Sequence, residues 1–87
     1  IKSRYLLFNS SFNSSTVIHY QLPVASSVSL RVYNVLGQQV STLVAAEMQN
    51  AGYKHVTFEA NGVASGVYFY RLQAGNFIET EKFVLLR

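Results

Sequence analysis

Apolar and polar residues alternate along much of this chain, and the alternation has a period of two. The pattern is clearest in residues 16–22 and 28–33. The residues that fall on the apolar face of these two stretches are Ile18, Tyr20, Leu22, Val28, Leu30 and Val32. Successive side chains of a strand point to opposite faces of a sheet, so a period of two predicts half-buried strands whose apolar face turns inward.

Turn-forming residues separate this pattern into further strands. Residues 34–37 predict a tight turn in which Gly37 takes a positive φ, and residues 75–76 predict a two-residue hairpin connection. Further strands are expected at residues 38–44, 53–60, 66–74 and 77–87, and residues 1–8 are expected to form either a short first strand or an arm packed along the sandwich.

Two segments lack a clear strand pattern. Residues 9–15 are small and polar, so they predict a turn-rich loop with Phe12 closing one end of the core. Residues 45–52 end in a glycine and predict a loop that carries the chain from one sheet to another.

The segment around Gly66 is the most informative part of the chain. Glycine permits a sharp backbone turn, and the β-branched and aromatic residues that follow it favour a strand. A Gly-x-Tyr sequence before a late strand is typical of the tyrosine corner in immunoglobulin-type sandwiches. We therefore expect the Tyr68 hydroxyl to bond to the backbone upstream. Tyr70 then occupies the place of a core cysteine, and aromatic packing replaces the inter-sheet disulfide.

These elements predict an all-β fold, an immunoglobulin-like antiparallel β-sandwich of about seven short strands. A small barrel is the alternative architecture. The 49% hydrophobic content is ample for one core, and 87 residues are too few for a second. We expect residues 1–87 to be a single domain excised from the C-terminus of a larger secreted protein, because the chain begins without methionine and ends within a predicted strand.

The distribution of charged and of apolar residues argues against two classes of partner, nucleic acids and a membrane-spanning environment. The net charge is +3, but the seven Lys and Arg residues are spread along the chain, whereas nucleic-acid binders concentrate them, so we expect no nucleic acid. No apolar run approaches the length of a membrane helix, so the domain is not expected to span a membrane. Without cysteine, the sequence leaves the redox compartment open.

Residues with catalytic potential are few. The chain has no Asp or Cys, and Glu79 and Glu81, which share one face of the last predicted strand, are interpreted as a solvated edge. His19 and His55 fall on outward faces without a neighbouring carboxylate, which does not indicate a metal site. We therefore predict no enzyme activity, no catalytic residue, no metal and no cofactor.

Aromatic residues on outward faces suggest a different function. Tyr33, Phe69 and Phe77 are candidates for a sugar-binding platform. A carbohydrate-binding module of an extracellular enzyme, or an immunoglobulin-like spacer, is therefore the alternative to the function considered next.

An ordered set of motifs resembles the type A C-terminal sorting domain of the type IX secretion system, also called the Por secretion system. The resemblance extends from about Leu7 to Arg87. Its blocks are Phe12-Asn13-x-Ser15-Thr16-x-Ile18, Tyr20-x-Leu22-Pro23, residues 32–38, Ala51-Gly52, residues 65–72 and residues 82–87. The family usually begins Asn-Pro-Phe-Asn-Pro-Ser-Thr, whereas this chain has serines in place of both prolines.

The resemblance implies a non-catalytic signal that directs a Bacteroidetes-type cargo protein through the outer membrane. The cargo passes through the periplasm and is secreted or held at the cell surface. The implied partners are the outer-membrane translocon and shuttle protein of type IX secretion, together with a sortase-like peptidase.

The family motifs also imply the recognition residues. Gly66 and Tyr68 match its Gly-x-Tyr motif, and Gly75 matches its hairpin glycine. The basic and apolar terminal strand comprises Lys82, Phe83, Val84, Leu85, Leu86 and Arg87. An edge strand can be recognised by strand addition, so we expect this last strand to carry the signal and to permit homodimers through edge strands.

Overall fold

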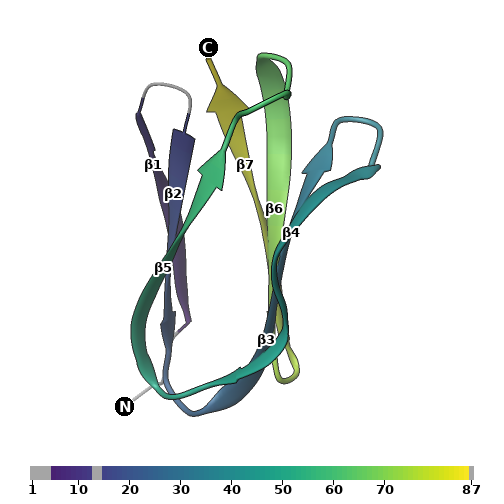
Figure 1. Ribbon diagram of the computed structural model, residues 1–87. Coiled ribbons are helices and arrows are strands. Elements are labelled where there is room, and N and C mark those ends of the chain that lie inside the picture. The colour runs from purple at the N-terminus through teal and green to yellow at the C-terminus, as the bar shows by residue number, and fades with distance from the viewer. Residues whose placement is uncertain (1–4, 13–14, 87) are drawn as a thin grey trace.

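Two antiparallel sheets pack face to face as a sandwich (Figure 1). The computed structural model describes residues 5–12 and 15–86. The strands are β1 (Leu6–Phe12), β2 (Ser15–Leu22), β3 (Ser26–Asn34), β4 (Gln39–Gln49), β5 (Gly52–Glu59), β6 (Gly66–Ala74) and β7 (Phe77–Leu85). One sheet has the order β1-β2-β5 and the other has the order β4-β3-β6-β7. The described residues contain no helix, and the predicted all-β sandwich is confirmed.

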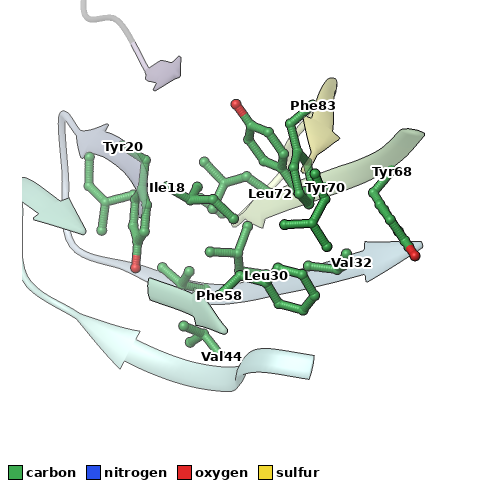
Figure 2. Close-up of a cluster of buried hydrophobic side chains, with 14 of the residues drawn as sticks. Ile18, Tyr20, Leu30, Val32, Val44, Phe58, Tyr68, Tyr70, Leu72 and Phe83 are labelled. Atoms are coloured by element: carbon green, nitrogen blue, oxygen red, sulfur yellow. The ribbon is translucent and has the colours of Figure 1, made fainter. Parts of the chain in front are cut away.

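The core lies between the two sheets and is formed by alternate residues of their strands, several of which are labelled in Figure 2. All six residues that the alternation placed inward in β2 and β3 are at most 1% exposed. The buried apolar residues are Ile18, Tyr20, Leu22, Val28, Leu30, Val32, Val44, Phe58, Ala60, Tyr68, Tyr70, Leu72, Ala74, Phe83 and Leu85.

The prediction of a loop at residues 45–52 is wrong, because β4 continues to Gln49 and β5 begins at Gly52. The β3–β4 register shifts between Val28 and Leu30, and opposite this shift Ala46 takes a φ of 50°. The Ala46 amide donates to the Ser29 hydroxyl at 3.1 Å. This bulge bends β4, so the strand itself curves from the four-stranded sheet toward the three-stranded sheet (Figure 1).

The predicted loop at residues 9–15 is also largely strand. β1 runs to Phe12 and pairs with β2 along its length, for example Asn9 with Ile18. Ladder hydrogen bonds come from the backbone, so small polar side chains do not prevent pairing at an edge. The parts of these predictions at residues 1–4 and 13–14, and the placement of the Phe12 side chain, lie outside the described residues.

Three buried tyrosines have hydrogen-bonded hydroxyl groups. Tyr68 donates to the carbonyl of Ala64 at 2.6 Å, which confirms the predicted tyrosine corner. Tyr70 of β6 donates to Asn9 Oδ1 of β1 at 3.0 Å, and Tyr20 of β2 donates to Gln49 Oε1 of β4 at 2.7 Å. The last two bonds connect one sheet to the other. One joins β1 to β6 and the other joins β2 to β4, so they hold the two sheets together at two separate places.

Aromatic packing joins the two sheets, as predicted for a chain without cysteine. Phe83 of β7 meets Phe58 of β5 edge-on, with ring centroids 5.9 Å apart. The Phe83 ring also lies 5.8 Å from that of Tyr68 and 5.7 Å from that of Tyr70 (Figure 2). Phe83 therefore links the two tyrosines of its own sheet to Phe58 of the other sheet.

Thr16 is fully buried, and its hydroxyl has no hydrogen-bond partner within the described part of the chain. Burying an unpaired hydroxyl costs about 1–3 kcal/mol. We expect Thr16→Val, which replaces the hydroxyl by a methyl group, to raise the free energy of unfolding in urea by about 1 kcal/mol. Thr16→Ser keeps the hydroxyl and should lower it. A valine variant no more stable than the parent would show that the hydroxyl is satisfied.

Candidate recognition site

The last strand, β7, is an edge strand, as the sequence predicted for a recognition element. In the order β4-β3-β6-β7 it pairs only with β6, from Gly66 opposite Leu85 to Ala74 opposite Phe77. Near its start, the ring of Phe77 stacks on Tyr5 at 4.1 Å. The rest of its outer backbone edge has no strand partner in the described structure, so this edge offers hydrogen-bonding groups to another chain.

Three of the predicted recognition residues have structural roles in the neighbouring strand and turn. Gly66 begins β6 with a φ of 156°, and Tyr68 is the buried tyrosine of the corner. Gly75 takes a φ of 58° in the hairpin turn, and its amide donates to the Ser27 carbonyl at 3.1 Å. Their positions account for these residue types by folding alone.

The terminal strand divides its residues between two faces. Phe83 and Leu85 are buried core residues, at 3% and 2% exposure. Of the described members of this set, Lys82, Val84 and Leu86 are exposed and offer side chains to a partner. The remaining member of the predicted set, Arg87, lies outside the described residues.

Exposed apolar side chains form a short strip at the C-terminal end of this strand. Val84 is opposite Val67 of β6, and both lie on the outer face of the sheet with 49% and 36% exposure. Leu86, just beyond the strand, is 73% exposed. A partner that pairs with the β7 edge would therefore also find apolar side chains at its C-terminal end.

Glu79 and Glu81 were interpreted as a solvated edge, but they lie on the inner face of β7, in line with Phe83, and are only partly exposed. A hydrogen bond between the two side chains raises the pKa of Glu79, and burial and the charge of Glu81 raise it further. Inward-pointing charges on an edge strand hinder unwanted strand pairing. The position of the pair on an edge strand therefore gives these two carboxylates a structural explanation.

His19 and His55 lie outward, as predicted, and face each other across β2 and β5 with ring centroids 6.3 Å apart. His19 Nε2 is 3.0 Å from Ser10 Oγ, and the Phe8 ring stacks on His19 at 4.7 Å. The described residues contain no cluster of three or more His, Cys, Asp or Glu side chains suited to a metal ion.

Two of the three aromatic residues considered for a sugar-binding platform, Tyr33 and Phe69, lie on the outer face of the four-stranded sheet. Tyr33 and Phe69 line a shallow depression of about 380 Å³. Phe77 does not belong to it, because this ring packs on the inner side against Tyr5. Arg71 and Thr80, which were not predicted from the sequence, also line the depression, together with residues of the β3–β4 turn. The alternation of Arg71 and Thr80 with inward-facing residues of β6 and β7 indicates that both side chains face outward. Only the strand register shows that they lie next to each other.

Comparisons with known proteins show the family of this chain. A family model described as a secretion system C-terminal sorting domain matches residues 11–86. The comparison with curated proteins finds no match. None of the described residues forms a helix long and apolar enough to cross a membrane.

Proposed function

Because the chain belongs to the family of type IX secretion C-terminal sorting domains, we propose that the secretion machinery recognises it through the open edge of β7. The family function is that of a non-catalytic signal, and it marks proteins that are exported to the cell surface or secreted. The observation that carries the proposal is the position of β7, a terminal strand with only one neighbour in its sheet.

Strand addition explains how this edge would be recognised. Backbone groups of an added strand supply affinity, and alternate side chains supply specificity. On β7 the alternate residues that face outward include Lys82 and Val84, and Leu86 follows just beyond the strand. A partner strand would thus contact the cation of Lys82 and a short apolar strip, while Phe83 and Leu85 remain in the core and hold the edge in place.

The family suggests which components of the machinery would pair with this edge. We assign the strand-adding partner to the shuttle protein or the outer-membrane translocon of type IX secretion, and expect a sortase-like peptidase to act on the cargo afterwards. A homodimer formed through β7 would occupy the same edge. Dimerisation and recognition should therefore compete, and the dimer should dissociate before export.

An export assay with surface variants tests the proposal. Deleting residues 83–87 is unsuitable alone, because it removes the core residues Phe83 and Leu85. Val84→Asp instead places a charge on the exposed strip of β7. In a type IX host, a periplasmic reporter fused to residues 1–87 should reach the surface or medium, and Val84→Asp should reduce that fraction about tenfold, equivalent to about 1.4 kcal/mol of recognition energy.

Met48→Asp is the matched control, because Met48 is 68% exposed on β4, the opposite edge of the same sheet. Both variants should keep the parent's circular dichroism spectrum and melting temperature, and the control should be exported normally. Equal export of all three fusions would contradict recognition through β7. Retention of the unmodified fusion in the periplasm would instead contradict the sorting function of this chain.

A further inference from the structure

The charges of this domain are distributed unequally between its two outer faces. Of the Lys and Arg residues that the structure describes, Arg31, Arg71 and Lys82 lie on the outer face of the four-stranded sheet, on β3, β6 and β7. The fourth, Lys54, belongs to β5 of the other sheet. No described carboxylate shares the outer face of the four-stranded sheet. The four glutamates of the chain lie elsewhere in the domain, at Glu47, Glu59, Glu79 and Glu81.

The strand register arranges this face in two adjacent rows across the sheet. One row contains Arg31, Arg71 and Thr80, and the other contains Tyr33, Phe69 and Lys82. We call these six residues the aromatic-basic face. Arg31 and Arg71 are direct cross-strand partners, and like charges placed opposite each other destabilise a sheet. The sequence therefore keeps an unfavourable pair that a bound anion would neutralise.

Contacts within the aromatic-basic face hold one guanidinium group in position. Arg71 Cζ lies 5.2 Å from the centroid of the Tyr33 ring, and Arg71 Nε donates to Thr80 Oγ1 at 3.4 Å. The depression of about 380 Å³ lies here, and Asn34, Val35 and Gly37 of the β3–β4 turn close one side of it. The depression has the size of a small-ligand site, with a cation and two aromatic rings on its walls.

We propose that the aromatic-basic face binds an acidic saccharide, with a sugar ring against Tyr33 or Phe69 and its carboxylate on Arg71. An aromatic ring offers a flat apolar surface to the apolar face of a sugar. The planar guanidinium group binds a carboxylate through two parallel hydrogen bonds. Arg31 and Lys82 extend the positive charge from Arg71 in both directions across the strands. Successive acidic sugar units of one saccharide chain could therefore each pair with a cation.

The observations favour a saccharide over other polyanions. Nucleic acids share the preference for cations and aromatic rings, but proteins of this family act at the cell surface or beyond it. The carboxylates of an acidic peptide would bind the cations, but the peptide would offer no flat apolar surface to the rings of Tyr33 and Phe69. The inference goes beyond sorting, because it concerns the broad face of the sheet and not the β7 edge.

Binding of defined probes tests the proposal. Tri-galacturonic acid, added to the 87-residue chain at low ionic strength, should shift the amide resonances of residues 31, 33, 69, 71 and 80 and raise the melting temperature. Its methyl ester, which lacks the charges, should bind at least tenfold more weakly. Arg71→Gln should weaken binding of the acid about tenfold or more, since hydrogen bonds to charged groups contribute about 1.5–3 kcal/mol. Tyr33→Leu should weaken it as well.

Matched controls separate a sugar site from general attraction to anions. Tyr53→Leu removes an exposed aromatic ring from the opposite sheet, at 76% exposure, and should leave the affinity unchanged. Tri-glutamate and a thymidine trinucleotide, which lack the acidic sugar ring, should bind more weakly than tri-galacturonic acid. Equal binding of either probe, equal binding of the methyl ester, or no shift up to millimolar concentration would each overturn the proposal.

Discussion

Replacing Phe83 by alanine should lower the free energy of unfolding by about 3–5 kcal/mol, the range for a buried aromatic residue cut to a methyl group. The Phe83 side chain is 3% exposed. Its ring contacts Phe58 of the other sheet, and it also contacts Tyr68 and Tyr70 of its own sheet. Its removal leaves a cavity where the sheets meet, and β7 loses its main anchor to the core. Urea denaturation followed by circular dichroism gives the change directly.

Two variants at neighbouring positions calibrate this result. Phe83→Leu keeps most of the apolar volume and should lose substantially less stability than the alanine variant. Val84→Ala removes methyl groups from an exposed position of the same strand and should change stability by no more than about 0.5 kcal/mol. A loss below 1 kcal/mol for Phe83→Ala would mean that the core closes without this ring.

Alkaline solution should unfold the domain progressively above pH 10, and Tyr70 should be a main cause. Burial raises the pKa of Tyr70 above its usual 10, and the charges of Glu81 and Glu79 raise it further. The neutral phenol is therefore favoured in the folded state. Its stabilisation is fully present below pH 10 and is lost, by about 1.4 kcal/mol per pH unit, as the pH rises toward the folded-state pKa.

The Tyr70→Phe variant isolates this contribution. It loses the hydrogen bond to Asn9 and should be less stable at neutral pH, but its stability should fall less steeply between pH 10 and 12. Burial likewise raises the pKa of Tyr20, so part of the dependence should remain. Identical slopes for Tyr70→Phe and the parent would exclude Tyr70 as the cause.

The strands with regular alternation could be predicted from the sequence, together with their inward faces. In β2 and β3 every second residue is apolar, and burial follows that pattern residue by residue. The corner at Tyr68 was predictable because its glycine and tyrosine meet a local geometric requirement. The end of β4 was not, because a bulge at Ala46 breaks the period and lets a mostly exposed strand continue.

The candidate sites were harder to predict, because they depend on which strands are neighbours. The sequence indicated that residues 82–87 form an edge, but the burial pattern was needed to separate the exposed Val84 from the core residues Phe83 and Leu85. Phe77, Glu79 and Glu81 face inward, a phase that a short and partly polar stretch does not determine. The grouping of Tyr33 with Arg71 follows from β3–β6 pairing, over a separation of 38 residues that no local pattern reports.

The course of the first and last strands determines how the domain would respond to mechanical load. β1 begins at one end of the sandwich, and β7 finishes at the opposite end (Figure 1). A force that pulls these two points apart acts along the strands, so the β1–β2 and β6–β7 ladders are loaded in shear. The hydrogen bonds of a ladder then share the load instead of opening one after another. A force applied between these two points would thus meet high resistance to unfolding.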